Sequence, residues 1–202
     1  GPSDFKTKHR FLRVGAIPPG ASIGEYRLVD SDELFLITKG LAFVTVNGRT
    51  ARIVAPSMVP ARMGETIGIA NPGKEEVEFA WLATEAVKGT YNPAVLGNDL
   101  LKKQFEQPCP FVWIPMDYGG FRITIPSAHQ GKGPIYDTFG RLSKEYYTTL
   151  WGAFYLILPP GTSIGYHRHD IHEELYFVVK GTARGTVDDV TLDLKAGDCT
   201  LC

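Results

Sequence analysis

Short apolar runs separated by glycine, proline and asparagine recur along most of this 202-residue chain. The runs are rich in β-branched and aromatic side chains, which is typical of the strands of a sandwich or a barrel. Strands are predicted at residues 11–14, 33–37, 41–46, 52–54, 77–82, 111–114, 121–125, 154–158, 175–179 and 190–194. Between two of them, Asn47-Gly48 favours a two-residue hairpin turn of type I′. The pattern therefore predicts an all-β protein with mainly antiparallel strands.

The middle of the chain, residues 86–149, interrupts this rhythm. Residues 93–106 contain one short helix candidate, opened by Asn98. Residues 126–141 are polar and rich in glycine, which is typical of a loop, and loops of this kind often shape pockets. Three residues of this loop are candidates for a pocket by their location alone: His129, Tyr136 and Asp137.

The chain also contains one sequence pattern twice. Residues 18–24 recur as residues 159–165, an offset of 141 positions from Gly20 to Gly161. The register continues without a gap through several further pairs: Arg27 and Arg168, Glu33 and Glu174, Leu34 and Leu175, Lys39 and Lys180, Gly40 and Gly181. A repeat of this length indicates a duplicated domain. We therefore expect two β domains, at residues 4–85 and 150–202, joined by residues 86–149 as a linker with a short helix and strands.

The second copy carries residues that can bind a metal ion. His167 and His169 are two positions apart, and such residues point to the same face of a strand. A turn and a second strand can return Glu174 to the same interior, whereas Glu173 would face the other way. Two neutral imidazoles and one carboxylate are part of the ligand set of many iron, manganese, nickel and zinc proteins. The sequence therefore predicts His167, His169 and Glu174 as metal ligands.

These residues resemble motif 1 of the cupin superfamily, G(x)5HxH(x)3–4E(x)6G. Every spacing of the motif is kept by Gly161, His167, His169, Glu174 and Gly181. The resemblance implies small antiparallel β-barrels or jelly rolls that hold a metal ion in the barrel mouth. Together with the repeat, it implies a bicupin, with two cupin-type barrels and a mixed linker segment between them.

Two further residues near the motif have more than one interpretation. His172 is a hydrogen-bond partner of a ligand, a replacement ligand or a polar residue of the turn. Tyr176 shares a strand face with Glu174, so it is a candidate catalytic residue as a proton donor or substrate contact, with packing inside the barrel as the alternative.

The first copy has lost most of the ligand set. Tyr26 and Leu28 stand where the second copy has His167 and His169. Motif 2 of the family ends in PxGxxHxxxN, and the first copy has Ile67 at the position of the ligand histidine. We therefore expect a metal-free first domain. In the second copy the corresponding histidine and asparagine would fall near positions 208 and 212, so we expect a truncated site, with a domain swap or completion by the middle segment as alternatives.

The bulk composition excludes several classes of partner. The net charge is −1 and the basic residues are spread along the chain, so we expect no nucleic-acid partner. No apolar run approaches the ~20 residues of a membrane span, and there is no signal-like N-terminus. Three cysteines give no disulfide framework, which indicates a reduced cytoplasm. We interpret the spacing of Cys199 and Cys202 as coincidence, and we expect a homodimer.

The resemblance implies a range of reactions, from which fold alone does not select one. We expect a metal-dependent bicupin enzyme that acts on a small polar organic acid or a related metabolite. Dioxygenase chemistry is favoured, and the alternatives are a metal-dependent isomerase or lyase, or a non-catalytic cupin that binds a small ligand. Iron is the favoured ion, and manganese, nickel and zinc also fit the predicted ligands.

Overall fold

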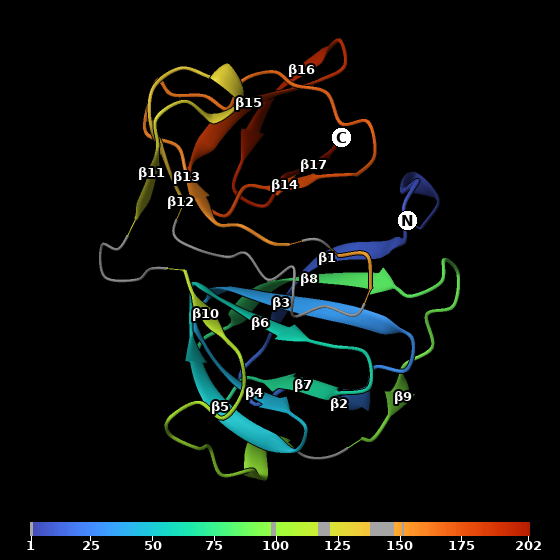
Figure 1. Ribbon diagram of the computed structural model, residues 1–202. Helices are drawn as coiled ribbons and strands as arrows, with labels where there is room; N and C mark the ends of the chain where they lie inside the picture. Colours follow the sequence, from blue (N-terminus) through green and yellow to red (C-terminus); the bar gives the residue numbers. More distant parts are fainter. Residues whose placement is uncertain (1, 98–99, 117–121, 138–147, 151) are drawn as a thin grey trace. The chain divides into compact units, whose positions relative to one another are not determined.

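The computed structural model describes residues 2–97, 100–116, 122–137, 148–150 and 152–202 (Figure 1). Its strand ladders are antiparallel, which confirms the all-β, antiparallel prediction. The helical elements of these residues are short 3₁₀ turns: η1 (Pro2–Asp4), η2 (Leu100–Lys102) and η3 (Ala128–Gln130). The helix expected within residues 93–106 is therefore reduced to η2, and Asn98 lies outside the described residues. None of the helices in the described part has the length and hydropathy that a membrane crossing requires.

The chain folds into two compact units, and each unit is built from two segments. The first unit comprises Gly1–Arg122 and Thr138–Tyr155, and the second comprises Ile123–Asp137 and Leu156–Cys202. The middle segment expected as a linker, residues 86–149, is thus divided between the two units.

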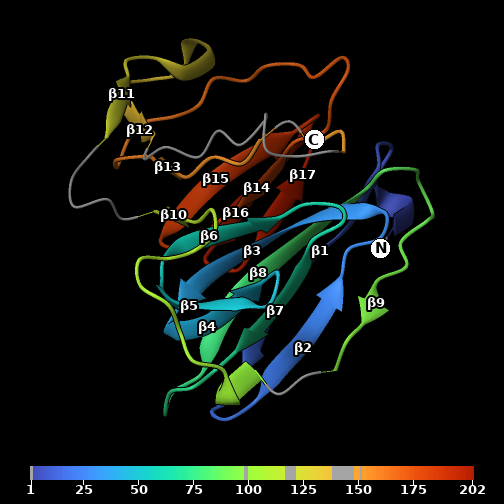
Figure 2. The same cartoon turned by 60° about the horizontal axis from the view of Figure 1, so that its bottom comes forward.

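The first unit consists of two five-stranded sheets that face each other (Figure 2). One sheet has the order β1-β8-β3-β6-β10 and the other has the order β5-β4-β7-β2-β9. The strands are β1 (His9–Ile17), β2 (Ser22–Arg27), β3 (Ser31–Lys39), β4 (Leu41–Val46), β5 (Arg49–Val54), β6 (Ser57–Ala61), β7 (Thr66–Ala70), β8 (Val77–Glu85), β9 (Ala94–Val95) and β10 (Ile114–Pro115). The predicted strands at 11–14, 33–37, 41–46, 52–54 and 77–82 are confirmed. Strands β2, β6 and β7 were not predicted, because glycine or proline interrupts their apolar runs.

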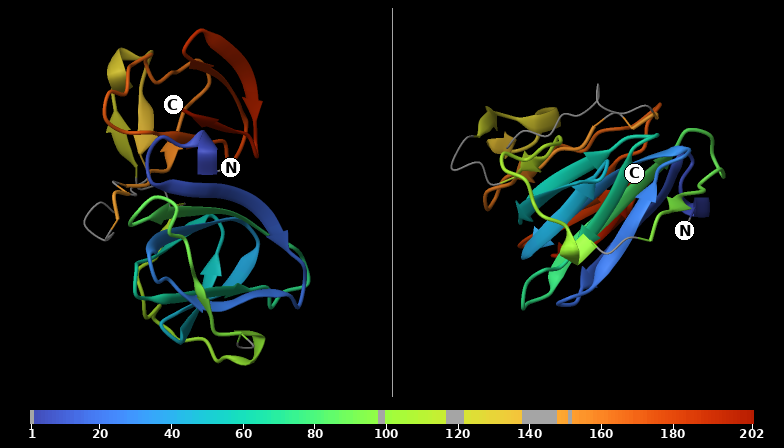
Figure 3. Two further views of the ribbon diagram at one scale, coloured as in Figure 1. Left: turned by 90° about the vertical axis from the view of Figure 1, so that its right-hand side faces the viewer. Right: turned by 90° about the horizontal axis from the view of Figure 1, so that it is seen from below.

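The core of the first unit lies between its two sheets (Figure 3). Phe35, Ile37 and Ile69 are fully buried there. Phe35 stacks on Trp81, with ring centroids 5.1 Å apart. Alternate residues of each strand point inward, so one apolar face per sheet is enough to fill the space between the sheets.

Turn chemistry also follows the sequence in this unit. Asn47 and Gly48 join β4 to β5, and both have positive φ, 51° and 77°. Positive φ at both central residues is what a type I′ hairpin requires, so this prediction is confirmed.

The second unit contains shorter strands and smaller sheets (Figure 1). Its strands are β11 (Ile123–Ile125), β12 (Ile135–Asp137), β13 (Leu156–Ile157), β14 (Leu175–Phe177), β15 (Thr182–Val187), β16 (Val190–Lys195) and β17 (Cys199–Leu201). They pair as β11-β12-β13, β14-β17 and β15-β16. The strands predicted at 154–158 and 175–179 are therefore present but shorter. Of the prediction at 111–114, only Ile114 lies in a strand.

Backbone details recur at the offset of the sequence repeat. Three pairs of equivalent residues share a positive φ: Gly20 and Gly161 (75° and 78°), Gly40 and Gly181 (86° and 84°), and Asn47 and Asp188 (51° and 50°). The hydroxyls of Thr45 and Thr50 lie 2.8 Å apart, and those of Thr186 and Thr191 lie 2.9 Å apart. The second hairpin, β15–β16, thus repeats the cross-strand hydrogen bond of the first, β4–β5.

Candidate metal centre

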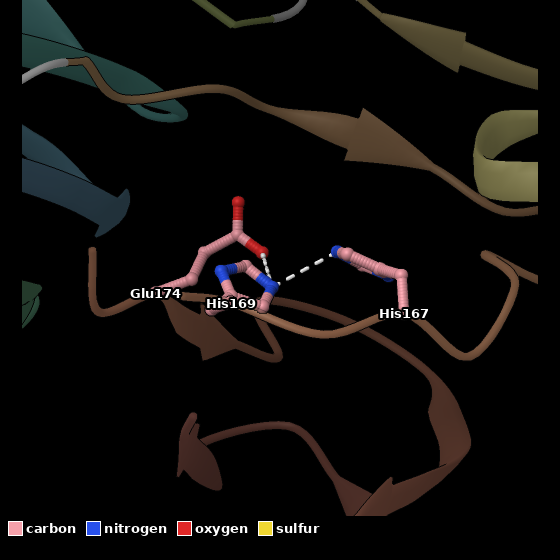
Figure 4. A group of neighbouring side chains, drawn as sticks. All are labelled: His167, His169 and Glu174. Carbon is pink, nitrogen blue, oxygen red and sulfur yellow. Dashed lines mark hydrogen bonds and ion pairs between the residues drawn. The ribbon is translucent and has the colours of Figure 1, made fainter. Parts of the chain in front are cut away.

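Three side chains of the second unit point toward one another: His167, His169 and Glu174 (Figure 4). Each offers one ligand atom, and these atoms all lie within 4.8 Å of one another. Within the described ranges, this is the one group of three or more histidine, cysteine, aspartate or glutamate residues that meets this criterion. The structure therefore brings together the three residues that the sequence predicted as ligands.

The spacing of the ligand atoms suits a first-row metal ion. His169 Nε2 lies 2.9 Å from His167 Nε2 and 3.5 Å from Glu174 Oε2. Two atoms that bind one ion at about 2.1 Å, with an angle of about 90–110° at the ion, are about 3.0–3.4 Å apart. Both measured distances are close to this range, so small adjustments of the side chains would admit an ion.

The local backbone explains how the group is assembled. His167 and His169 lie on the segment between β13 and β14, which forms no ladder of its own. Glu174 directly precedes β14, and its backbone N–H and carbonyl bond the carbonyl and N–H of Cys202 at 2.8 and 3.0 Å. These bonds extend the β14–β17 pairing by one residue. The carboxylate is therefore carried by a sheet, whereas the imidazoles are carried by a loop.

The hydrogen bonds of the imidazoles leave the correct nitrogens available for an ion. His167 Nδ1 lies 2.8 Å from the carbonyl oxygen of Gly165. A carbonyl only accepts, so Nδ1 carries the proton and Nε2 of His167 keeps its lone pair. His169 Nδ1 lies 2.7 Å from His172 Nε2. Of the three interpretations of His172, the structure favours a hydrogen-bond partner of a ligand.

The electrostatics of the group also favour a cation. Burial lowers the pKa of His169; the Glu174 carboxylate opposes this shift, and the neighbouring imidazoles reinforce it. A neutral imidazole is the form that binds metal. Glu174 Oε2 is buried and has no hydrogen-bond partner among the described residues. A buried carboxylate oxygen without a donor is costly, and a bound cation would satisfy it.

Tyr176 of β14 lies beside Glu174. Burial raises the pKa of the Tyr176 phenol well above its usual range, and a hydrogen bond to the Glu174 side chain raises it further. The phenol therefore keeps its proton and donates to the carboxylate, which helps to hold Glu174 in place. A catalytic role for Tyr176 stays a prediction.

The loop residues named by location have different positions. Tyr136 and Asp137 lie on β12, and Asp137 is not part of the converging group. His129 stacks on His167 with ring centroids 3.8 Å apart and planes 7° from parallel. Sequence spacing gave no signal for this contact, because the two histidines are far apart in the chain.

The equivalent place in the first unit is filled by hydrogen-bond donors. Glu33 is fully buried, and its carboxylate accepts bonds from the Tyr26 hydroxyl at 2.5 Å, the Trp81 Nε1–H at 2.7 Å and the Tyr91 hydroxyl at 2.8 Å. Burial raises the pKa of Glu33, and these three bonds oppose the shift. Leu28 corresponds to His169 and Ile67 stands at the position of the motif 2 histidine, and both are fully buried.

The two C-terminal cysteines do not have the character of a reactive pair. Burial raises the pKa of both the Cys199 and the Cys202 thiols. Reactive cysteines have a lowered pKa, so neither thiol has the properties of a redox centre.

Residues 154–202 match the family model described as "Cupin domain". Among curated protein sequences, none matches this chain significantly.

Solved structures resemble parts of the chain. One, described as a predicted oxalate decarboxylase from Thermotoga maritima, is 27% identical over 39% of this chain and 68% of its own, with a TM-score of 0.38. The cupin domain of Cnp3 from Schizosaccharomyces pombe is 27% identical over 37% of this chain and 54% of its own, with a TM-score of 0.35. An uncharacterised protein with a double-stranded β-helix domain from Klebsiella pneumoniae is 21% identical over 45% and 73%, with a TM-score of 0.40.

Proposed function

We propose that this chain, whose residues 154–202 match a cupin domain model, is a metal-dependent bicupin enzyme that acts on a small polar organic acid. The observation that carries the proposal is the convergence of His167, His169 and Glu174 at distances suited to one ion. In this proposal the two imidazoles and the carboxylate hold the ion, and the remaining coordination positions are open to substrate.

Charge supports an acid as the substrate. A divalent ion held by one carboxylate and two neutral imidazoles keeps a net charge of about +1, because only Glu174 compensates it. Such a centre attracts an anionic group more strongly than a neutral one. Hydroxy acids, keto acids and acidic enols all offer oxygen atoms of this kind.

The ligand set also favours iron and dioxygenase chemistry. Two histidines and one carboxylate with open positions are the ligand set typical of non-haem iron oxygenases. When bound, such an ion polarises a coordinated oxygen, lowers the pKa of bound water and exchanges electrons with dioxygen.

The protein's own contribution is to fix this set of ligands. Gly165 and His172 hold the two imidazoles through their Nδ1 atoms, at 2.8 and 2.7 Å. Tyr176 donates a hydrogen bond to Glu174. Outer hydrogen bonds of this kind orient metal ligands and fix the histidine tautomers.

Metal analysis tests the proposal. The purified chain is loaded anaerobically with Fe(II), desalted and compared with the His167→Ala variant, and His9→Ala of the first unit is the control. We expect about one equivalent of metal in the wild type and in the control, and its loss in His167→Ala. Less than roughly a tenth of an equivalent in the wild type would contradict a metal-dependent function.

Oxygen consumption then separates the reaction classes. The iron-loaded protein is offered catechols, diketones and keto acids, and dioxygen uptake is recorded together with substrate loss. Uptake that depends on His167 supports a dioxygenase. Substrate loss without dioxygen uptake indicates an isomerase or lyase. No turnover of any compound in the panel indicates a ligand-binding cupin.

A further inference from the structure

Histidines are unevenly distributed in this protein. The chain has five, and four of them gather in the second unit: His129, His167, His169 and His172. Three belong to the loop before β14. The fourth, His129, comes from η3, in the other segment of the unit, and it is the one member that neither the ligand spacing nor a hydrogen bond explains.

Hydrogen bonds join the η3 loop to the segment that carries His167. Gly165 N–H donates to the Ala128 carbonyl at 2.9 Å, Ser163 N–H to the Lys132 carbonyl at 2.9 Å, and Lys132 N–H to Ser163 Oγ at 2.9 Å. The two backbones run so close together that a Cβ at Gly165 would lie 1.9 Å from the His129 carbonyl oxygen. A Cβ at Gly131 would lie 2.0 Å from the carbonyl oxygen of Ser163. Only glycine is compatible with either position.

The backbone conformation of the loop is also unusual. His129 and Gln130 have positive φ, 48° and 61°. This left-handed region is disfavoured for residues other than glycine and persists only where the surrounding contacts hold it. The hydrogen-bonded backbone therefore fixes the direction of the His129 side chain, although this side chain is exposed.

The direction of the ring excludes one role and indicates another. The His129 and His167 planes are nearly parallel, with centroids 3.8 Å apart. An imidazole binds an ion in its own plane, so an ion in the plane of His167 lies well away from the lone pairs of His129. His129 in this orientation does not ligate the same ion. Its contact is with the face of the His167 ring.

Gly165 links the two ends of this arrangement. Its N–H bonds the Ala128 carbonyl, and its carbonyl accepts the bond from His167 Nδ1. The η3 loop thus holds His167 twice, at its edge through Gly165 and on its face through His129. A ring held at both places keeps its rotamer, and its Nε2 stays directed at His169 and Glu174.

We propose that His129 is a positioning residue of the metal centre, which fixes the plane of the His167 ligand by stacking on it. The proposal rests on the proposed function, since it requires that His167 binds an ion. Loss of an outer contact that orients a ligand typically weakens metal affinity about 10–100-fold. A stack is weaker than a hydrogen bond, so we expect a change of about tenfold, together with a changed ligand field.

The test compares two substitutions of His129. His129→Asn removes the ring and keeps a residue type that tolerates positive φ. His129→Phe keeps a flat ring for stacking and removes both nitrogens. Lys132→Ala changes a side chain of the same loop and serves as the control. Cobalt(II) affinity is measured by competition with a chelator, and the cobalt absorption spectrum reports the geometry of the ligands.

We expect His129→Asn to bind cobalt about tenfold more weakly, with a shifted spectrum. His129→Phe and Lys132→Ala should stay within about twofold of the wild type in affinity and keep its spectrum. Wild-type affinity and spectrum in His129→Asn would overturn the positioning role. Equal losses in His129→Phe and His129→Asn would overturn it as well, because stacking would then not be the cause.

His167→Ala separates this inference from the proposed function. Cobalt bound by the wild type and lost in His167→Ala supports the metal centre, whatever the His129 variants do. A wild type that binds no cobalt, or full binding in His167→Ala, would refute the proposed function, and the role of His129 with it.

Discussion

Glu33 and Glu174 occupy equivalent positions of the repeat, yet their carboxylates have opposite surroundings. The Glu33 carboxylate accepts three hydrogen bonds, from the Tyr26 hydroxyl, the Trp81 Nε1–H and the Tyr91 hydroxyl. Glu174 Oε2 faces an imidazole nitrogen and is without a hydrogen-bond donor in the described structure. The three donors satisfy Glu33, whereas Tyr176 donates to the Glu174 carboxylate but leaves Oε2 without a donor, and a cation would satisfy this atom. The neighbours therefore decide whether this glutamate is a structural acid or a ligand.

One part of this difference is the residue that corresponds to His167. Tyrosine stands at position 26 where the second copy has His167, and the pKa of Tyr26 is raised by burial and by Glu33. The Tyr26 phenol is therefore a permanent donor. His167 instead donates its Nδ1–H to the Gly165 carbonyl, and the lone pair of its Nε2 points toward the other ligands. Tyr26 thus replaces a lone pair by a donor, and Leu28 and Ile67 replace two further ligand positions by buried apolar side chains.

The largest expected effect is on metal affinity, and it differs between substitutions of Glu174 and Glu33. Glu174→Ala should weaken metal binding about a thousandfold, because structural metal sites bind with about 10–16 kcal/mol and Glu174 is one of the three ligands that share this free energy. Glu33→Ala should leave the affinity unchanged. Chelator competition measures both. Equal losses in the two variants would mean that the first unit also binds the ion.

The second effect concerns stability. Glu33→Ala should lower the free energy of unfolding of the first unit by about 2–3 kcal/mol, because three donors lose their acceptor. Trp81 and Trp113 belong to the first unit and the described part of the second unit has no tryptophan, so tryptophan fluorescence in urea follows the correct transition. Glu174→Ala is the control. A loss below about 0.5 kcal/mol in Glu33→Ala would show that water replaces the carboxylate at little cost.

The third effect tests the hydrogen bond behind His169. His172→Ala removes the partner of His169 Nδ1, and metal affinity should fall about tenfold. His172→Gln offers an amide oxygen as a new acceptor and should restore part of the affinity. If His172→Ala binds as tightly as the wild type, His172 is a polar turn residue and no more.

The smallest effect is the pH dependence of the first unit. Burial raises the pKa of folded Glu33, so the folded protein keeps this proton where the unfolded chain has lost it. The resulting stability is complete below the unfolded pKa of about 4.3 and is lost as the pH rises through the folded pKa. Compared with Glu33→Gln, the wild type should therefore lose stability with rising pH in this window, by at most about 1.4 kcal/mol per unit. Urea unfolding at several pH values measures the difference, and parallel curves would contradict it.

Much of the fold was predictable because it depends on local patterns. The strands β3, β4 and β8 carry runs of apolar and aromatic residues, and Asn47-Gly48 encodes its own turn. Strands β6 and β7 were missed because Pro60 and Gly68 interrupt their patterns. The pairing of neighbouring strands compensates for these residues, and a sequence taken alone does not show its neighbours.

The candidate site was predictable only in part, for a similar reason. Spacing along the chain identifies His167, His169 and Glu174, because a short loop and a strand bring them together. The contact of His129 depends on the approach of Gly131 to Gly165 across two segments, and no local pattern records that approach. The one signal available in the sequence was that four of the five histidines of the chain lie in this unit.

The pairing of β12 with β13 has a practical consequence for anyone who dissects this protein. The two strands belong to the same unit but to separate stretches of the gene, through Tyr136 with Ile157 and Asp137 with Leu156. A fragment that begins at residue 156 would lack β12, and β13 would then offer an unpaired edge to other molecules. Such a fragment should aggregate on expression, so studies of the histidine cluster require the intact polypeptide.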